Sequence, residues 1–461
     1  MTSHNSVTPD EHRASSAPTS SAAPTPSDAT VPSEATSQSE ATAQSDAPAQ
    51  SDATAALPAL IESLDSPESI AAEVSAQLEA FLAEKAAEFE AISPDATAIG
   101  EALIEFTRGG KRIRPVLLWW GFQLAGGDVR PTTGTDAGTT GAGAGPTTGT
   151  AADVTAGLAQ AAGSLELLHA AALIHDDVID NSDTRRGRPA LHRQFEARHQ
   201  RSGFHGDGAS FGVSASIVIG DICLALSEEL FERSQETLGG SRPARELRGT
   251  VRRDVMVGQY LDVLAEVIPL DDDRIADRAW EVLSFKSAKY SVEQPLLLGA
   301  ALTGADEDLL AEISGFGLPL GQAFQLRDDV LGIAGDPQAT GKPAGDDIRE
   351  GKRTVLIAET AARISADQLE VLASRLGVPD LTDTEVAECV DMITDSGGLS
   401  AVESFIADKH AHAATVVDTW ARSGSAAVSA AGSAASARVR IGSAAQDRLK
   451  GFATALSYRS S

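Results

Sequence analysis

The chain has 461 residues, of which 42% are hydrophobic and 22% charged, and its 37 basic and 66 acidic residues leave a formal net charge of −29. This balance argues against a nucleic-acid binder, because such a protein needs a basic surface to displace counterions from phosphates. It still allows a local basic site for a small phosphorylated ligand. Cys223 and Cys389 are the only cysteines, so a disulfide framework is excluded and a zinc cluster built on thiolates is not expected.

Targeting and membrane signals are weak in this sequence. The N-terminus shows no basic start followed by an apolar run, so we expect no secretory signal. The longest apolar stretch, residues 213–226, is shorter than the roughly 18 residues that span a bilayer, and it contains Asp221. We therefore expect a cytoplasmic protein with no transmembrane segment.

Two stretches of biased composition divide the chain. Residues 1–57 are rich in Ala, Ser, Thr and Pro and lack aromatic residues. Such a segment buries too little apolar surface to offset its ordering entropy, so we expect a disordered tail. Residues 126–152 are rich in Gly, Thr and Ala, which is typical of a flexible insertion in a surface loop. The rest of residues 58–461 is expected to form one large domain.

Helix signals then follow one another along the chain. Ser66 and Pro67 form an N-cap and a first-turn proline, and Ser93-Pro94 begins a second helix that Gly109-Gly110 ends. A long helix with a wide apolar face is expected over residues 157–180. Further helices are expected over residues 214–236, 244–268, 274–301, 306–334, 351–374, 383–394, 398–421 and 426–457. Strand-like alternation is scarce, so the sequence predicts an all-α fold.

The segment His175-Asp176-Asp177-Val178-Ile179-Asp180 carries the strongest chemical signal. On a helix, Asp176 and Asp180 lie four residues apart on one face, where two carboxylates repel each other. Mg²⁺ removes the repulsion, because it binds one or two carboxylates and fills its octahedron with waters and substrate phosphates. A solvated acidic face is the alternative for a lone motif of this kind. The apolar residues 170–174 before it favour the metal site.

A second acidic pair, Asp328-Asp329, also lies late in an apolar helix. Two such helices facing each other would hold several divalent ions across a cavity. Basic clusters accompany the acids, namely Lys111-Arg112-Ile113-Arg114, Arg185-Arg186-Gly187-Arg188, Lys286, Lys289, Lys342 and Lys352-Arg353. Any one cluster could be a solvated helix end. Together with the acids they indicate a metal-bound, strongly anionic ligand such as a diphosphate, because Arg binds phosphate oxygens bidentately.

Other catalytic signals are missing from the sequence. His169 and His175 lie in an apolar helix, where a histidine is more often a satisfied core group than a catalyst, and neither has a Ser or Cys partner in the manner of a triad. The chain contains no P-loop and no glycine fingerprint after a strand, so nothing indicates an ATP or NAD site.

Four blocks of this sequence, residues 109–115, 169–188, 321–332 and 335–354, closely resemble the polyprenyl synthetases, also known as trans-isoprenyl diphosphate synthases. The segment that starts at His169 is most similar to the bacterial geranylgeranyl or longer-chain members. The resemblance runs from about residue 60 to the C-terminus, apart from the insertion. It implies an isoprenoid-synthase helical bundle around a deep central cavity, usually as a homodimer.

The resemblance also implies a role for each matching residue. Asp176, Asp177 and Asp180 match the first aspartate-rich motif, and Asp328 and Asp329 the second. Asp176, Asp180 and Asp328 are the implied metal ligands, and three Mg²⁺ ions are expected with substrate bound. The residues that match the isopentenyl diphosphate site are Lys111, Arg114, His169 and Arg186. Those that match the allylic diphosphate site and its polar surroundings are Arg185, Gln259, Lys286, Ser287, Gln325, Lys342 and Lys352.

The sequence departs from the family pattern at two positions. Gly332 stands where many relatives have a third aspartate in the second motif, and that aspartate is the one least needed for metal. Ser287 replaces a frequent threonine but keeps the hydroxyl group. Neither departure puts the activity in doubt.

The activity implied by the resemblance is head-to-tail condensation of isopentenyl diphosphate with allylic diphosphates. In this family, bulky residues four or five positions before the first motif stop chain growth early, whereas this chain has Ala171 and Ala172 there. Leu168, about 12 Å along the helix from the motif, is the next residue that could close the tunnel in which the product grows. We therefore expect geranylgeranyl diphosphate as the product and expect Ala171→Phe to shorten it.

Three alternative functions stay open from the sequence. One is synthesis of longer polyprenyl diphosphates. A class I terpene cyclase shares the first motif, but it lacks a second-substrate site like the one that Lys111, Arg114 and Arg186 suggest. A non-catalytic regulatory subunit of a heteromeric synthase typically loses aspartates, whereas this chain keeps both acidic pairs.

Overall fold

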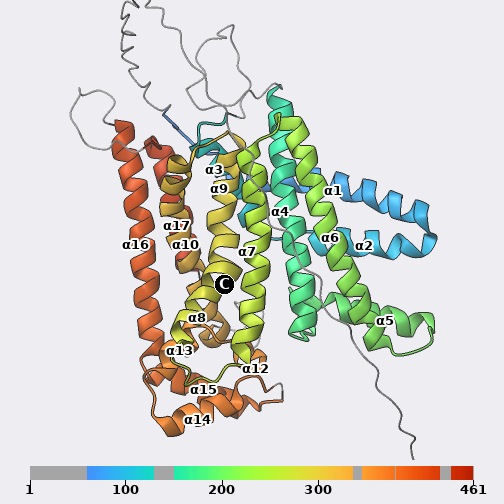
Figure 1. Ribbon diagram of the computed structural model, residues 1–461, viewed down its shortest axis with the longest axis vertical. Helices are drawn as coiled ribbons and strands as arrows, with labels where there is room; N and C mark the ends of the chain where they lie inside the picture. The colour runs from blue at the N-terminus through green and yellow to red at the C-terminus, as the bar shows by residue number, and fades with distance from the viewer. Residues whose placement is uncertain (1–59, 129–149, 336–344, 379, 426–437, 460–461) are drawn as a thin grey trace, which may run out of the picture. The chain divides into compact units, whose positions relative to one another are not determined.

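The computed structural model describes residues 60–128, 150–335, 345–378, 380–425 and 438–459, all within a compact unit that begins at Ala56. Within these residues the fold is all-α (Figure 1). Two very short strands, β1 (Thr184–Arg185) and β2 (Arg188–Pro189), pair antiparallel as a small hairpin. The tail predicted over residues 1–57, most of the predicted insertion and Lys342 lie outside the described residues.

The helices follow in chain order and carry the labels of Figure 1. They are α1 (Pro67–Ile92), η1 (Pro94–Ala96), α2 (Thr97–Thr107), α3 (Ile113–Leu124), α4 (Ala151–Ile179), α5 (Leu191–Ser202), α6 (Gly208–Leu238), α7 (Arg242–Glu266), α8 (Ile275–Val282), η2 (Leu283–Glu293), α9 (Gln294–Leu302), α10 (Glu307–Ala334), α12 (Asp346–Glu350), α13 (Val355–Ala361), α14 (Ala366–Arg375), α15 (Asp383–Asp395), α16 (Gly398–Ser425) and α17 (Ser443–Ser457).

Capping side chains account for several helix starts. The Ser66 hydroxyl accepts a hydrogen bond from the Ser69 backbone N–H at 3.2 Å, which confirms the predicted start of α1. Ser93 caps only the short 3₁₀ turn η1, because α2 begins afterwards at Thr97. Thr150 and Asp153 form a capping box, so α4 begins at Ala151, six residues before the predicted start, and its first turn takes in the last residues of the predicted insertion.

Several helices differ in extent from the prediction, and α3 was not predicted. The region predicted as one helix over 351–374 breaks into α13 and α14, because Ser365 and Gln368 form a new capping box there. Residues 438–442 are not helical, and Ile441 instead pairs with Ile61 in an isolated parallel bridge. Helix α3 was missed because it is buried from Pro115 to Leu124 and therefore shows no amphipathic period.

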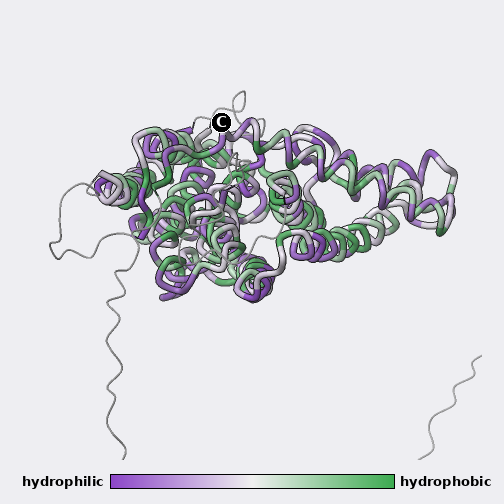
Figure 2. The backbone as a smooth tube through the Cα atoms, turned by 90° about the horizontal axis from the view of Figure 1, so that it is seen from above, coloured by the Kyte–Doolittle hydropathy of each residue, from purple (hydrophilic) through white to green (hydrophobic). Residues whose placement is uncertain are grey.

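Helix α4 forms the centre of one side of the core. It packs along α6 and also contacts α1 and α3, while α10 packs against η2 and α16 (Figure 1). Gly121 allows α3 and α9 to approach closely, because any Cβ atom at this position would lie 1.9 Å from the Leu296 carbonyl oxygen. Seen from above, hydrophobic and hydrophilic residues alternate along the helices (Figure 2), as in amphipathic helices that share a core.

Two of the described helices, α4 and α6, are long and apolar enough to cross a membrane by length and composition. The apolar window of α4 is 78% buried, as in a core helix, whereas that of α6 is only 33% buried. The uncovered face of α6 includes Ile217 and Val218. The predicted absence of a membrane span therefore stays a prediction.

Candidate active site

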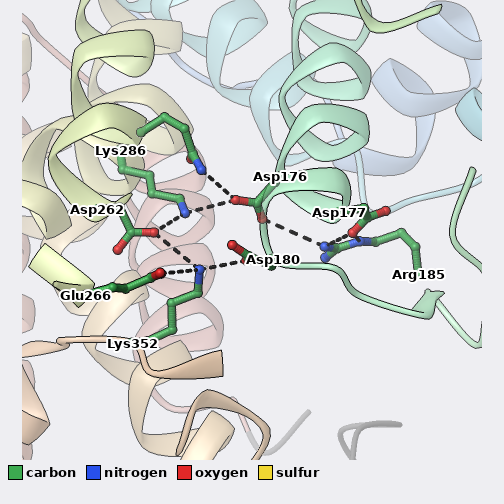
Figure 3. A network of polar contacts seen from close by, with 9 residues as sticks. Asp176, Asp177, Asp180, Arg185, Asp262, Glu266, Lys286 and Lys352 are labelled. Carbon is green, nitrogen blue, oxygen red and sulfur yellow. Dashed lines mark hydrogen bonds and ion pairs between the residues drawn. The ribbon is translucent and has the colours of Figure 1, made fainter. Parts of the chain in front are cut away.

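Asp176, near the C-terminal end of α4, faces two other helices (Figure 3). Its Oδ1 accepts a hydrogen bond from Gln259 Nε2 of α7 at 2.9 Å and one from Lys286 Nζ of η2 at 3.1 Å. Asp180, one turn later, accepts from Lys352 Nζ at 2.6 Å. The structure therefore brings together two acids and two lysines that are far apart in the sequence.

Asp262 of α7 lies between the two lysines and was not predicted as a site residue. Its Oδ2 pairs with Lys286 Nζ and lies 3.4 Å from Lys352 Nζ. Glu266, one turn later, lies 3.3 Å from Lys352 Nζ (Figure 3). A sequence signal existed, because Asp262 and Glu266 follow Gln259 at helical spacing and place three polar groups on one face of the 244–268 helix.

The opposite charges in this network shift the pKa of each group. Burial raises the pKa of Asp176, but the Lys286 and Lys352 ammonium groups lower it more, so this pKa lies below its ordinary value. Burial and the repulsion from Asp176 raise the pKa of Asp180. Burial lowers the pKa of each lysine, but nearby Asp176, Asp180 and Asp262 outweigh it and keep the lysine pKa values raised. Both lysines are therefore charged at neutral pH, as diphosphate binding requires.

Asp177 points away from the two lysines and holds Arg185 (Figure 3). It is fully buried, and its Oδ1 accepts a hydrogen bond from Arg185 Nε at 2.7 Å. The same guanidinium lies 3.8 Å from the Asp176 carboxylate. Asp177 therefore positions Arg185 beside the first acidic motif.

The acids of the second motif have different partners. Asp329 is buried on α10 and accepts a hydrogen bond from Gln325 Nε2 at 2.9 Å. Burial, with some repulsion from Asp347 and Asp262, raises the pKa of Asp329 to about 8. Asp328 forms an ion pair with Arg459, beyond the end of α17.

A second basic cluster lies around the start of α3. Arg114 donates a hydrogen bond to Ser291 Oγ at 2.8 Å. Arg186 lies against the Gly110 turn, where an added Cβ would lie 3.7 Å from its guanidinium. Burial, followed by the charges of Arg114 and Arg186, lowers the pKa of His169 well below its ordinary value. The structure thus brings together three of the four residues predicted for isopentenyl diphosphate, and the fourth, Lys111, is exposed beside Gly110.

The remaining predicted residues lie close to these clusters in the fold. Ser287 follows Lys286 on η2 and is partly exposed. Ala171 and Leu168 on α4 are buried in the core, whereas Ala172 is partly exposed. Because Ala172 precedes Asp176 by four residues, it lies on the same face of α4 as the first motif.

The carboxylates suit a divalent ion that arrives with its substrate. Among the described residues, no group of three or more His, Cys, Asp or Glu side chains is arranged to hold a metal ion. Asp176 and Asp180 supply two oxygen donors at the end of α4, which is the contribution that Mg²⁺ takes from a protein when diphosphate and water fill its other positions. The residues present therefore fit a metal–diphosphate complex.

Comparisons with known proteins show which family this chain resembles. The sequence profile of the polyprenyl synthetase family matches residues 97–393. The crystal structure of geranylgeranyl pyrophosphate synthase from Corynebacterium glutamicum, complexed with isoprenyl diphosphate and magnesium, superposes with a TM-score of 0.69 at 33% identity and covers 85% of this chain and 98% of that one.

Curated relatives of known product extend the comparison. The geranylgeranyl diphosphate synthase of Saccharolobus solfataricus is 28% identical over 292 residues, which are 62% of this chain and 74% of that protein. The geranylfarnesyl diphosphate synthase of Aeropyrum pernix is 26% identical over 320 residues, 69% of this chain and 85% of that protein.

The helical fold and the facing acid and base clusters fit an enzyme that acts on diphosphates. The chain belongs to the polyprenyl synthetase family, the trans-isoprenyl diphosphate synthases, and it is a prenyltransferase.

Proposed function

We propose that this protein is a Mg²⁺-dependent geranylgeranyl diphosphate synthase, which condenses isopentenyl diphosphate with allylic diphosphates. One observation carries the proposal: helix η2 contacts both the acid–lysine network around Asp176 and the basic cluster around Arg114. Lys286 of η2 donates to Asp176 in the acid–lysine network, and Ser291 of η2 accepts from Arg114 in the second basic cluster. A separate site for each of two diphosphate groups suits an enzyme that joins the carbon chains of two prenyl diphosphates.

The chemistry follows from where these charges lie. The C–O bond of the allylic diphosphate breaks, and both electrons leave with the diphosphate. Lys286, Lys352 and Arg185 surround the first motif and stabilise the charge that develops there. Mg²⁺ held by Asp176, Asp180 and Asp328 would add to this stabilisation.

The carbon skeleton then grows by one isoprene unit. The double bond of isopentenyl diphosphate supplies the electron pair for the new C–C bond, and a proton is lost from the resulting cation. The released diphosphate is the base that we propose for this proton. His169, Arg114 and Arg186 hold the diphosphate of isopentenyl diphosphate close to the allylic carbon.

We propose the C20 product because small side chains line the relevant face of α4. Ala172 lies on the Asp176 face and is partly exposed, and Leu168 lies one further turn away. The relative from Aeropyrum pernix is named for a C25 product, so a longer product is the second candidate. The regulatory-subunit alternative gains no support, because both acidic pairs are retained.

We further propose that the protein is a homodimer. Apolar side chains are exposed along α6 and α7. The two helices are linked by the buried Arg248 of α7, which donates hydrogen bonds to the Ser227 hydroxyl and the Glu228 carboxylate of α6. The exposed residues are Phe211, Ile217, Val218, Met256, Val257, Tyr260 and Val263. A second copy of the same surface would cover these apolar groups, as in a two-fold interface.

Product analysis tests the proposed function. The purified chain is incubated with Mg²⁺, isopentenyl diphosphate and, separately, dimethylallyl, geranyl and farnesyl diphosphates, and the products are sized by mass spectrometry. A dominant C20 product is expected. Longer products would support the same chemistry and would place the residue that stops chain growth beyond Leu168. No elongation with any starter would overturn the standalone enzyme, and activity restored only by a partner chain would favour a regulatory subunit.

A further inference from the structure

Three buried polar atoms of neighbouring side chains find no hydrogen-bond partner among the described residues. They are Arg114 Nε, His169 Nδ1 and the Tyr290 hydroxyl oxygen. Burying such groups unpaired costs free energy, so each of them calls for a partner, and a bound ligand can supply one. Arg114 and His169 belong to the second basic cluster, and the Tyr290 ring lies near both.

Tyr290 lies at the centre of this group, although nothing in the sequence singled it out. Its side chain is 2% exposed, and the Arg114 guanidinium lies over its ring, 4.5 Å from the centroid. The His169 ring lies on another side, with its centroid 6.2 Å from that of Tyr290. Burial raises the pKa of the Tyr290 hydroxyl to about 12, so it keeps its proton as a donor at neutral pH.

The π-helical winding of η2 places these residues beside the first site. In an α-helix, residues five apart are rotated by about 140° and point to different sides. A π-helix closes its hydrogen bonds between residues five apart, so such residues lie above one another. Lys286 and Ser291 have this spacing in η2 (Leu283–Glu293). One face of the helix therefore serves Asp176 through Lys286 and Arg114 through Ser291.

We propose that Tyr290 and Ser291 are positioning residues for the second substrate: the Tyr290 ring and the Ser291 hydroxyl hold Arg114, and the Tyr290 hydroxyl completes the donors around the isopentenyl diphosphate headgroup. This inference rests on the proposed function, because it assigns that headgroup to the Arg114 cluster. It predicts that changes at the two residues affect isopentenyl diphosphate far more than the allylic substrate.

The test compares Tyr290→Leu, Tyr290→Phe and Ser291→Ala, with Ser374→Ala as the control because Ser374 is exposed on α14, away from both sites. Loss of the ring contact in Tyr290→Leu should raise the KM for isopentenyl diphosphate about 30-fold. Loss of one hydrogen bond in Tyr290→Phe or Ser291→Ala should raise it about threefold to tenfold. The KM for farnesyl diphosphate should change less than twofold in every variant.

Direct binding separates a positioning role from a general structural one. Calorimetry with isopentenyl diphosphate alone measures affinity without turnover, and circular dichroism checks that each variant is folded. The expected order of affinity is wild type, then Tyr290→Phe, then Tyr290→Leu. The inference is overturned if Tyr290→Leu binds isopentenyl diphosphate as tightly as Tyr290→Phe does. It is also overturned if the KM values for isopentenyl diphosphate and farnesyl diphosphate rise equally. Should Tyr290→Leu not fold, Ser291→Ala still decides, since an unchanged affinity there contradicts the proposal. A wild-type chain that binds isopentenyl diphosphate but elongates no starter would overturn only the proposed function.

Discussion

At the scale of single residues, charge pairing explains how the chain tolerates neighbouring acids inside the fold. Lys286 and Lys352 lie between Asp176, Asp180 and Asp262, so no carboxylate of this group faces another without a cation nearby. In the proposed reaction, diphosphate and metal would bring charges of both signs to the same place. The lysines are thus held, charged, where the leaving group would develop its negative charge.

Asp262→Asn should impair catalysis while leaving the fold intact. The change removes a negative charge that both lysines contact, and a hydrogen bond to a charged group contributes about 1.5–3 kcal/mol. The kcat for elongation should fall about 10- to 100-fold. Steady-state kinetics checks this against Glu246→Gln, which changes an exposed ion pair on the same helix. Equal kcat in both variants would show that Asp262 does not hold the lysines.

His169 should make stability depend on pH. Burial and the nearby arginines lower its native pKa well below 6.5, whereas the unfolded chain keeps the ordinary value. Its contribution is therefore complete above about pH 6.5 and is lost as the pH falls toward the native pKa, by about 1.4 kcal/mol per pH unit. Urea unfolding at pH 6.5 and 5.5 should show this extra loss in wild type and not in His169→Gln. The exposed His205→Gln is the control, and parallel behaviour of wild type and His169→Gln would contradict the assignment.

At the scale of secondary structure, the end of α4 and the winding of η2 set the geometry of both sites. Helix α4 presents Asp176 and Asp180 on one face, and the same face continues back to Ala172. Helix α10 instead directs Asp328 and Asp329 to different partners, since one pairs with Arg459 and the other with Gln325. We therefore expect product length and metal binding to depend on which face of a helix a residue occupies.

Ala172→Phe should shorten the product, because Ala172 is partly exposed on the face of the first motif. Ala171 is fully buried in the core, so Ala171→Phe, which the sequence predicted to shorten the product, should instead mainly cost stability, by about 1–3 kcal/mol. Mass spectrometry of products and thermal melts of both variants separate the two effects. An unchanged product distribution in Ala172→Phe would show that this face of α4 does not measure chain length.

Gly332→Asp, which restores the aspartate common among relatives, should destabilise this protein. A Cβ at Gly332 would lie 2.1 Å from the Asp347 carboxylate, so a side chain there meets both bulk and like charge. We expect a loss of about 1–3 kcal/mol in the free energy of unfolding. Gly315→Asp on the same helix is the matched control, because nothing lies within 4 Å of a Cβ there. Recovery of stability in the double variant Gly332→Asp, Asp347→Gly would confirm the cause, and no loss in the single variant would refute it.

At the scale of the whole molecule, uneven burial of apolar surface points to assembly. Helix α4 is enclosed by its neighbours, whereas α6 and α7 leave apolar side chains uncovered. A net charge of −29 keeps copies apart in general, so association needs a specific apolar patch. The faces of α6 and α7 provide such a patch.

Val257→Asp should dissociate the proposed dimer, because it places a charge among the exposed apolar residues of α7. Val257 is 48% exposed in the single chain. Light scattering after size exclusion should give a dimer for wild type and a monomer for the variant. Val371→Asp on α14 makes the same change at another exposed valine and should stay dimeric. A monomeric wild type would rule out the dimer.

The sequence by itself determined the all-α class and the family, and it predicted most of the residues of the candidate site. Helical periodicity, N-caps and acidic or basic motifs act over a few neighbouring residues, so they can be read along the chain. Helical spacing groups Asp262 with Gln259 and Glu266, but it does not show that α7 carries Asp262 to Lys352. In the same way, the sequence does not show that η2 carries Tyr290 and Ser291 to Arg114. Only the tertiary structure decided these pairings and the close approach of Asp347 to Gly332, because each depends on segments that the fold brings together.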